Sequence, residues 1–274
     1  MAEVETKHEE LLAAVEAPLL PGEKAAYWWL GQHTFIVKTA SQVIYFDPWL
    51  AADPNRQTQS PLQPHEAKFA TLALVSHGHT DHLDPITLRE MIEVSPLSLF
   101  VCPHTERQRL LDEARIPAER LHSMDAEDTL ELNGVKITAV KAKHEAYDRH
   151  PVLGYPYLGY VVETDGITIY HAGDTILWDG MISKLQQWKQ IDLAFIPING
   201  RDAERFRRNC MGNLTYQEAV EVAGELQVGL VVPAHYDMFI GNQEDPTKFV
   251  QYLEARYPTV RHQVGPAGRR ISLR

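Results

Sequence analysis

A short run rich in histidine constrains this sequence more than any other feature. His77, His79, Asp81 and His82 form the pattern H-x-H-x-D-H, which places four potential metal ligands within six residues. The run directly follows the apolar segment 71–75, which has the pattern of a buried strand. A strand that ends in a ligand-dense turn fixes its ligands on a rigid edge, as a metal site requires. Since the chain has 13 histidines in 274 residues, chance is a poor explanation for three in six positions.

Composition excludes several classes of protein. A formal net charge of −11 argues against a sequence-independent grip on nucleic acid, so we expect no nucleic-acid partner. Cys102 and Cys210 are the only cysteines, too few for a disulfide framework, which favours a reducing compartment. Residues 1–17 lack the basic and apolar regions of a signal peptide, and no run has the length of a membrane span. We therefore expect a cytoplasmic protein without a membrane partner.

The periodicity of the chain predicts two sheets. Residues 1–24 are expected to form an extension, helical over 5–16, which could be a flexible lead, a docked helix or an oligomer contact. Residues 25–274 are expected to form a single domain, which begins with a meander of three short strands. Asn133-Gly134 and Asp165-Gly166 each mark a hairpin. Strands with interspersed amphipathic helices predict an α/β fold of two packed sheets with helices outside.

Three later residues complete a possible metal site. His144, Asp174 and His235 each come at or just after the end of an apolar, strand-like segment. Each alone is more often a cap or a satisfied core group than a ligand. Their occurrence in this order after the histidine run is what indicates that they converge on one sheet edge.

With these residues in place, the chain resembles the metallo-β-lactamase superfamily from about residue 25 to its C-terminus. The resemblance implies a four-layer αββα sandwich and two divalent transition-metal ions, zinc or manganese in preference to iron. One ion would be held by His77, His79 and His144, and the other by Asp81, His82 and His235. Asp174 would bridge the two ions.

Within the superfamily, the sequence is most similar to the ascorbate-6-phosphate lactonase branch. The similarity rests on residues 28–31, 170–174 and 235–239, followed by Asn242 and Asp245-Pro246. Two positions depart from the pattern. That branch has an aspartate where this chain has His144, and related branches have Gly-His where this chain has Gln32.

The implied chemistry is hydrolysis. Two neighbouring cations lower the pKa of a bridging water and orient it for attack on a carbonyl or phosphoryl group. Asp81 and Asp174 are the expected catalytic residues, Asp174 as the bridge and Asp81 as a ligand that could also take or relay a proton. The expected substrate is a small anionic lactone or ester, such as a sugar-phosphate lactone.

Substrate recognition is expected from residues beside the ligands. Asn199 and Arg201 follow an apolar strand, and Arg201 could bind a phosphate or carboxylate, although a surface pair with Asp202 or Glu204 is equally compatible. Tyr236 and Asp237 adjoin His235 and could contact substrate or orient a ligand. The loop 147–157 is expected to form a mobile wall of the site. His33 and the other remaining histidines are assigned to structural or surface positions, with His171 packing beside the ligands.

Three alternatives stay open. A phosphodiesterase or nuclease would need a broad basic groove, against which the net charge counts. An iron oxidoreductase on the same fold would be supported by an appended redox domain. A non-catalytic metal-binding module would be supported by loss of ligands. The sequence leaves the number of subunits open, and a homo-oligomer is compatible with it.

Overall fold

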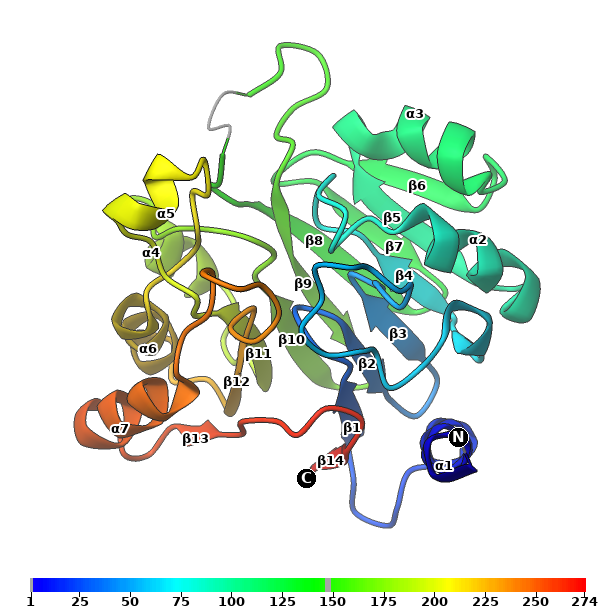
Figure 1. The fold of residues 1–274 in the computed structure, drawn as a ribbon, viewed down its shortest axis with the longest axis horizontal. Helices are drawn as coiled ribbons and strands as arrows, with labels where there is room; N and C mark the ends of the chain where they lie inside the picture. The colour runs from blue at the N-terminus through cyan, green and yellow to red at the C-terminus, as the bar shows by residue number, and fades with distance from the viewer. Residues whose placement is uncertain (1, 146–148) are drawn as a thin grey trace.

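Two sheets pack against each other between outer layers of helices (Figure 1). The computed structural model describes residues 2–145 and 149–274. Helices α2 and α3 lie outside the first sheet, and α4 and α6 lie outside the second. The predicted four-layer αββα sandwich is confirmed.

The first sheet begins as the expected meander and continues with parallel strands. Its order is β14-β1-β2-β3-β4-β5-β6, with β1 to β3 antiparallel and β3 to β6 parallel. The strands are β1 (Ala25–Trp29), β2 (Phe35–Lys38), β3 (Val43–Phe46), β4 (Leu72–Leu74), β5 (Leu99–Pro103), β6 (Leu121–Met124) and β14 (Arg270–Leu273).

The second sheet contains both predicted hairpins. Its order is β13-β12-β11-β10-β9-β8-β7. Asn133 (φ 49°) and Gly134 (φ 82°), and likewise Asp165 (φ 47°) and Gly166 (φ 75°), have the paired positive φ angles of two-residue hairpin turns. The strands are β7 (Thr129–Leu132), β8 (Val135–Lys141), β9 (Leu158–Thr164), β10 (Ile167–His171), β11 (Leu193–Pro197), β12 (Leu230–Ala234) and β13 (Arg261–His262).

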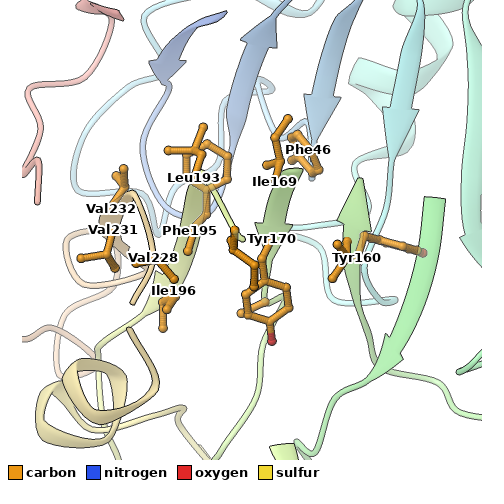
Figure 2. Packing of buried hydrophobic residues seen from close by; sticks show 14 of the residues in the cluster. Phe46, Tyr160, Ile169, Tyr170, Leu193, Phe195, Ile196, Val228, Val231 and Val232 are labelled. Carbon is orange, nitrogen blue, oxygen red and sulfur yellow. The ribbon is translucent and has the colours of Figure 1, made fainter. Parts of the chain in front are cut away.

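Apolar side chains fill the space between the sheets. Phe35 of the first sheet stacks on Phe195 of the second with ring centroids 3.7 Å apart. Figure 2 shows Ile169 and Phe195 on the face of the second sheet nearest Phe46, while Ile196 points to the opposite face. Burial of apolar surface on both faces of these strands is the main stabilising contribution to the fold.

The helices begin where the local sequence supplies caps. Asp84 and Asp245 each accept a backbone hydrogen bond at a helix start with proline next in the chain. Thr215 and Glu218 form a reciprocal capping box, as their T-x-x-E spacing predicts. The helices are α1 (Ala2–Glu16), α2 (Pro85–Val94), α3 (Arg107–Arg109, continued by a π turn, Leu110–Ala114), α4 (Met181–Leu185), α5 (Ala203–Arg207), α6 (Tyr216–Glu225) and α7 (Pro246–Arg256), with 3₁₀ turns at Pro64–Glu66 and His104–Glu106. Strands β6 and β13 and helix α5 were not predicted.

Helix α1 docks against the first sheet. Leu11 and Val15 are buried in the same apolar cluster as Trp28. The ammonium group of Lys38 donates to the carbonyl oxygens of Val15 (2.6 Å) and Glu16 (3.0 Å), at the negative end of the helix dipole. Among the described residues, none of the helices has the length and apolarity needed to cross a membrane.

Candidate metal centre

All seven predicted metal ligands lie together at one edge of the sandwich. The segment after β4 carries four of them, and the ends of β8, β10 and β12 supply one each. These strands run in the same direction within their sheets, so their carboxyl ends meet at that edge. The seven residues are His77, His79, Asp81, His82, His144, Asp174 and His235.

The ligands form two groups on either side of Asp174. In the first, Nε2 of His77 lies 3.0 Å from Nδ1 of His79, and Nε2 of His144 lies 3.6 Å from Oδ2 of Asp174. In the second, Nε2 of His82 lies 3.3 Å from Oδ1 of Asp174, and Nε2 of His235 lies 3.1 Å from Oδ2. Both oxygens of Asp174 therefore face imidazole nitrogens.

The second group also includes Asp81. Its Oδ2 lies 3.4 Å from Nε2 of His82 and 3.5 Å from Nε2 of His235. In the part of the chain that the structure describes, Nε2 of His82 and Oδ1 of Asp174 are buried without a hydrogen-bond partner, which is costly unless another group satisfies them. Imidazole nitrogens and carboxylate oxygens at this spacing fit a divalent transition metal.

The charges of the second group of ligands favour a bound cation. Burial alone would raise the pKa of Asp174, but His235 and His82 hold that pKa well below its ordinary value. Burial would likewise lower the pKa of His235, yet the carboxylates of Asp174 and Asp81 raise it to about 9. The buried carboxylates are therefore ionised, and positive charge beside them is stabilised.

A cavity of about 120 Å³ opens onto the ligands. It adjoins a hollow of about 210 Å³, with which it shares Glu145 and Met211. Within the described residues, neither lysine nor arginine lines the smaller cavity. Besides ligands, its lining consists of Glu145, Cys210, Met211, Gly212, Asn213, Phe239 and Asn242.

Comparison with known proteins decides the family. Residues 42–236 match the Beta-lactamase superfamily domain. The chain belongs to the metallo-β-lactamase superfamily. It is 31% identical over 230 residues to a UPF0173 metal-dependent hydrolase of Korarchaeum cryptofilum, covering 83% of this chain and 90% of that protein. It is 30% identical to another from Thermococcus kodakarensis, covering 86% of this chain and 95% of that protein.

Solved structures agree on the fold. The structure of Igni18, a metallo hydrolase from Ignicoccus hospitalis, aligns with a TM-score of 0.72 at 23% identity, covering 91% of this chain and 98% of that one. Together with the curated relatives, this makes the chain a metal-dependent hydrolase of the metallo-β-lactamase superfamily.

Two carboxylates outside the predicted ligand set, those of Asp47 and Glu145, orient metal-ligand histidines of this superfamily member. Oδ2 of Asp47 lies 2.6 Å from Nδ1 of His82, and Ser76 donates to both oxygens of Asp47. Oε2 of Glu145 lies 3.2 Å from Nε2 of His79. Such contacts fix the orientation of a ligating imidazole. Neither acid was predicted as a site residue, although Asp47 shows the same signal as the ligands, since it directly follows a buried strand.

Two further histidines, His33 and His171, pack beside the predicted metal ligands. The rings of His33 and His171 pack against each other at a tilt of 32°, with centroids 4.1 Å apart, and Nε2 of His171 lies 3.1 Å from the carbonyl oxygen of His33. Nδ1 of His33 lies 3.7 Å from Oδ1 of Asp174. The expected packing role of His171 agrees with this position, and His33 is structural but directly beside a ligand.

The structure places the four predicted substrate-binding residues outside the cavity lining. Asn199 is fully buried, donates to Oδ1 of Asn242 (2.8 Å) and accepts from Nδ2 of Asn213 (3.1 Å). It therefore holds two residues that do line the cavity. Arg201 forms a bidentate pair with Glu218 (2.5 and 2.6 Å), the partner that neither the substrate nor the surface interpretation had named.

Tyr236 and Asp237 are likewise turned toward other protein groups. The ring of Tyr236 packs on Trp29 with centroids 5.4 Å apart. Oδ1 of Asp237 accepts from the backbone N–H of Gln32 at 3.3 Å. These contacts give both residues a role in holding the segment that carries His235.

The predicted wall loop is described only in part. Tyr147 and Asp148, at the start of the range 147–157, lie outside the described residues. At the other end, the ring of Tyr157 lies 5.1 Å from that of His77 and 5.3 Å from that of His144. This end of the loop contacts the first group of ligands.

Proposed function

We propose that this hydrolase uses a two-ion centre to open a small ester or lactone. The observation that carries the proposal is the position of Asp174, whose carboxylate faces imidazoles of both groups. Its Oδ2 faces His144 of the first group and His235 of the second, and its Oδ1 faces His82 of the second. His77, His79 and His144 would hold the first ion, and Asp81, His82 and His235 the second. When bound, the ions lower the pKa of a water molecule and polarise the bond under attack.

Asp81 has the position of a proton acceptor. It is part of the second group and also lines the cavity, so it faces both a ligand position and the space for substrate. Burial would raise the pKa of Asp81, but His82 and His235 hold it well below its ordinary value. The ionised carboxylate would take up the proton of the attacking water and pass it to the leaving oxygen.

The cavity favours a substrate with hydrogen-bond donors. Oδ1 of Asn213 belongs to a residue of the lining and is buried without a partner among the described residues, so a hydroxyl or N–H of the substrate would satisfy it. Its Nδ2 is already used by Asn199, which fixes the orientation of the amide. A hydroxylated lactone, the kind of substrate that the resemblance to the lactonase branch implies, fits this recognition.

The cavity lining gives less support for a negatively charged substrate than for a hydroxylated one. Since neither lysine nor arginine of the described residues lines the cavity, an anionic substituent would depend mainly on the metal ions themselves. Two guanidinium groups contact residues of the lining instead: Nε of Arg205 donates to Oδ1 of Asn242, and Nη1 of Arg201 donates to the carbonyl oxygen of Asn213, each at 3.2 Å. We therefore propose the lactone or ester linkage as the defining feature of the substrate.

Metal content and a substrate panel test the proposal on one sample. Elemental analysis should give about two transition-metal ions per chain. The panel would contain hydroxylated and unsubstituted lactones, their phosphorylated forms, carboxyl esters and phosphodiesters. Lactone turnover that falls when hydroxyls are removed supports the proposal. Turnover of phosphodiesters alone would assign the site to a phosphodiesterase, and two bound ions without any turnover would favour a metal-binding module.

A further inference from the structure

Gln32 occupies a constrained position beside the metal centre. It lies in the turn between β1 and β2, is 1% exposed, and has φ +52°, a left-handed conformation that glutamine seldom adopts. Its carbonyl oxygen accepts from the backbone N–H of His235 (3.0 Å) and from Nε1 of Trp29 (3.1 Å). The turn is therefore tied to the segment that carries a metal ligand, and strain of this kind often accompanies function.

The side chain of Gln32 reaches into the second group of ligands. Its Nε2 lies 2.6 Å from Oδ2 of Asp81 and 2.9 Å from Nε2 of His235. These are two of the atoms that would face the second ion. For metal–ligand bonds of about 2.1 Å at right angles, neighbouring ligand atoms lie about 3 Å apart. The carboxamide of Gln32 is thus at the distance expected of another ligand of the same ion.

The carboxamide can present oxygen at this point. Its NH₂ group only donates, so it cannot bind a cation, but a half-turn about the terminal bond exchanges nitrogen and oxygen. Within the described residues, Oε1 of Gln32 is buried without a hydrogen-bond partner, so the turn gives up only the contacts of Nε2 with Asp81 and His235, whose atoms would face the ion instead. We propose that Gln32 is a protein ligand of the second ion, with its carboxamide oxygen turned toward the metal; this rests on the proposed two-ion centre.

A role toward the metal explains the position better than a role toward substrate. Gln32 is almost fully buried and is not among the residues that line the 120 Å³ cavity. Its oxygen would give the second ion a third oxygen ligand besides the carboxylates of Asp81 and Asp174. The first ion would instead be held mainly by three imidazoles. Oxygen ligands suit harder ions such as Mn²⁺, so Gln32 makes the second position more favourable for manganese than the first.

Metal titration of variants tests the assignment. Metal-stripped wild type, Gln32→Leu and Gln32→Glu would be titrated separately with Zn²⁺ and Mn²⁺ by calorimetry, with Co²⁺ absorption as a readout of coordination. Gln32→Leu should weaken one of the two binding events roughly tenfold or more, with the larger effect for Mn²⁺, and leave the other unchanged. Gln32→Glu, which keeps an oxygen at this position, should retain both events.

A second buried glutamine provides the matched control. Gln42 donates from Nε2 to the carbonyl oxygen of Asn133 (2.9 Å) and has no contact with the ligands, so Gln42→Leu should bind both ions normally. Should Gln32→Leu fail to fold, Gln32→Asn withdraws the amide by one methylene and should show the same selective loss.

The possible results separate the two proposals. Two ions in wild type with unchanged affinities in the Gln32 variants would overturn the role of Gln32 and leave the two-ion centre intact. Tighter binding in Gln32→Leu would also overturn it, since the amide would then compete with the ion. A single binding event in wild type would instead count against the two-ion centre, and this assignment would fall with it.

Discussion

Asp47 follows β3 and His82, 35 residues further on, lies in the segment after the neighbouring strand β4. The two share a hydrogen bond of 2.6 Å, from Nδ1 of the imidazole to Oδ2 of the carboxylate. Because Nδ1 is held in this way, Nε2 is the nitrogen that faces Asp81 and Asp174. The chain thus selects which nitrogen of His82 is offered to a metal. Asp47 is itself held by Ser76, so the orientation is set by backbone as well as side-chain contacts.

Replacing Asp47 should weaken metal binding without removing a ligand. Asp47→Asn preserves the shape of the side chain but removes its charge, so His82 loses its orienting carboxylate. We expect metal affinity to fall about 10- to 100-fold, as measured by competition with a chelator. Asp165→Asn is the control, because Asp165 lies in a turn away from the site, and asparagine suits its positive φ. Equal affinities for Asp47→Asn and wild type would contradict the orienting role.

Removing Asp174 should affect both groups of ligands. Asp174→Ala takes away the carboxylate that faces His82 and His235 on one side and His144 on the other. We expect most bound metal to be lost on dialysis and hydrolysis to fall to background. Asp192→Ala should keep its metal, because the Asp192 carboxylate accepts from the backbone of Thr168 instead. Near-normal turnover by Asp174→Ala would reject the two-ion centre.

The pair Glu23–Arg270 should make stability depend on acid pH. Hydrogen bonds from Arg270 (2.6 Å to each carboxylate oxygen) lower the pKa of Glu23 from 4.5 to about 2. A carboxyl group with a lowered folded-state pKa stabilises fully above its unfolded pKa, and this contribution is lost as the pH falls from about 4.5 towards 2.

Urea unfolding between pH 7 and pH 3 would measure this contribution. Glu23→Gln should lower the free energy of unfolding at pH 7, and its difference from wild type should shrink as the pH approaches 3. Glu131→Gln, at an exposed position of β7, should show little difference at either pH. A Glu23→Gln deficit that stays constant with pH would show that the charge of Glu23 is not the source of its effect.

The metal ligands were predictable because each stands beside a strand end and the pattern between them is short and regular. The residues around them were not. Asn213 and Asn242 lie in irregular segments, and what brings them together is Asn199, which the sequence suggested for another reason. The position of Gln32 depends on a positive φ that its residue type does not favour, so no local rule predicts it.

Arg201 shows why charge next to a strand end does not identify a partner. Glu218 is 17 residues further on and was recognised only as part of a capping box, yet it binds both terminal nitrogens of Arg201. Arg201 also donates to the carbonyl oxygen of Asn213 at 3.2 Å, which connects it to the cavity lining. The contacts of Arg201 are therefore those of a residue that holds this lining in place.

Arg201→Ala separates that role from direct contact with an anionic substrate. If Arg201 holds the lining, the variant should lose roughly 1 kcal/mol of stability, and KM should rise equally for anionic and neutral lactones. Arg207→Ala is the control, since Arg207 is exposed and pairs with Glu204 on the same short helix. A rise in KM confined to anionic substrates would instead show that Arg201 leaves Glu218 to bind the substrate, because only a direct ionic contact distinguishes the two kinds of lactone.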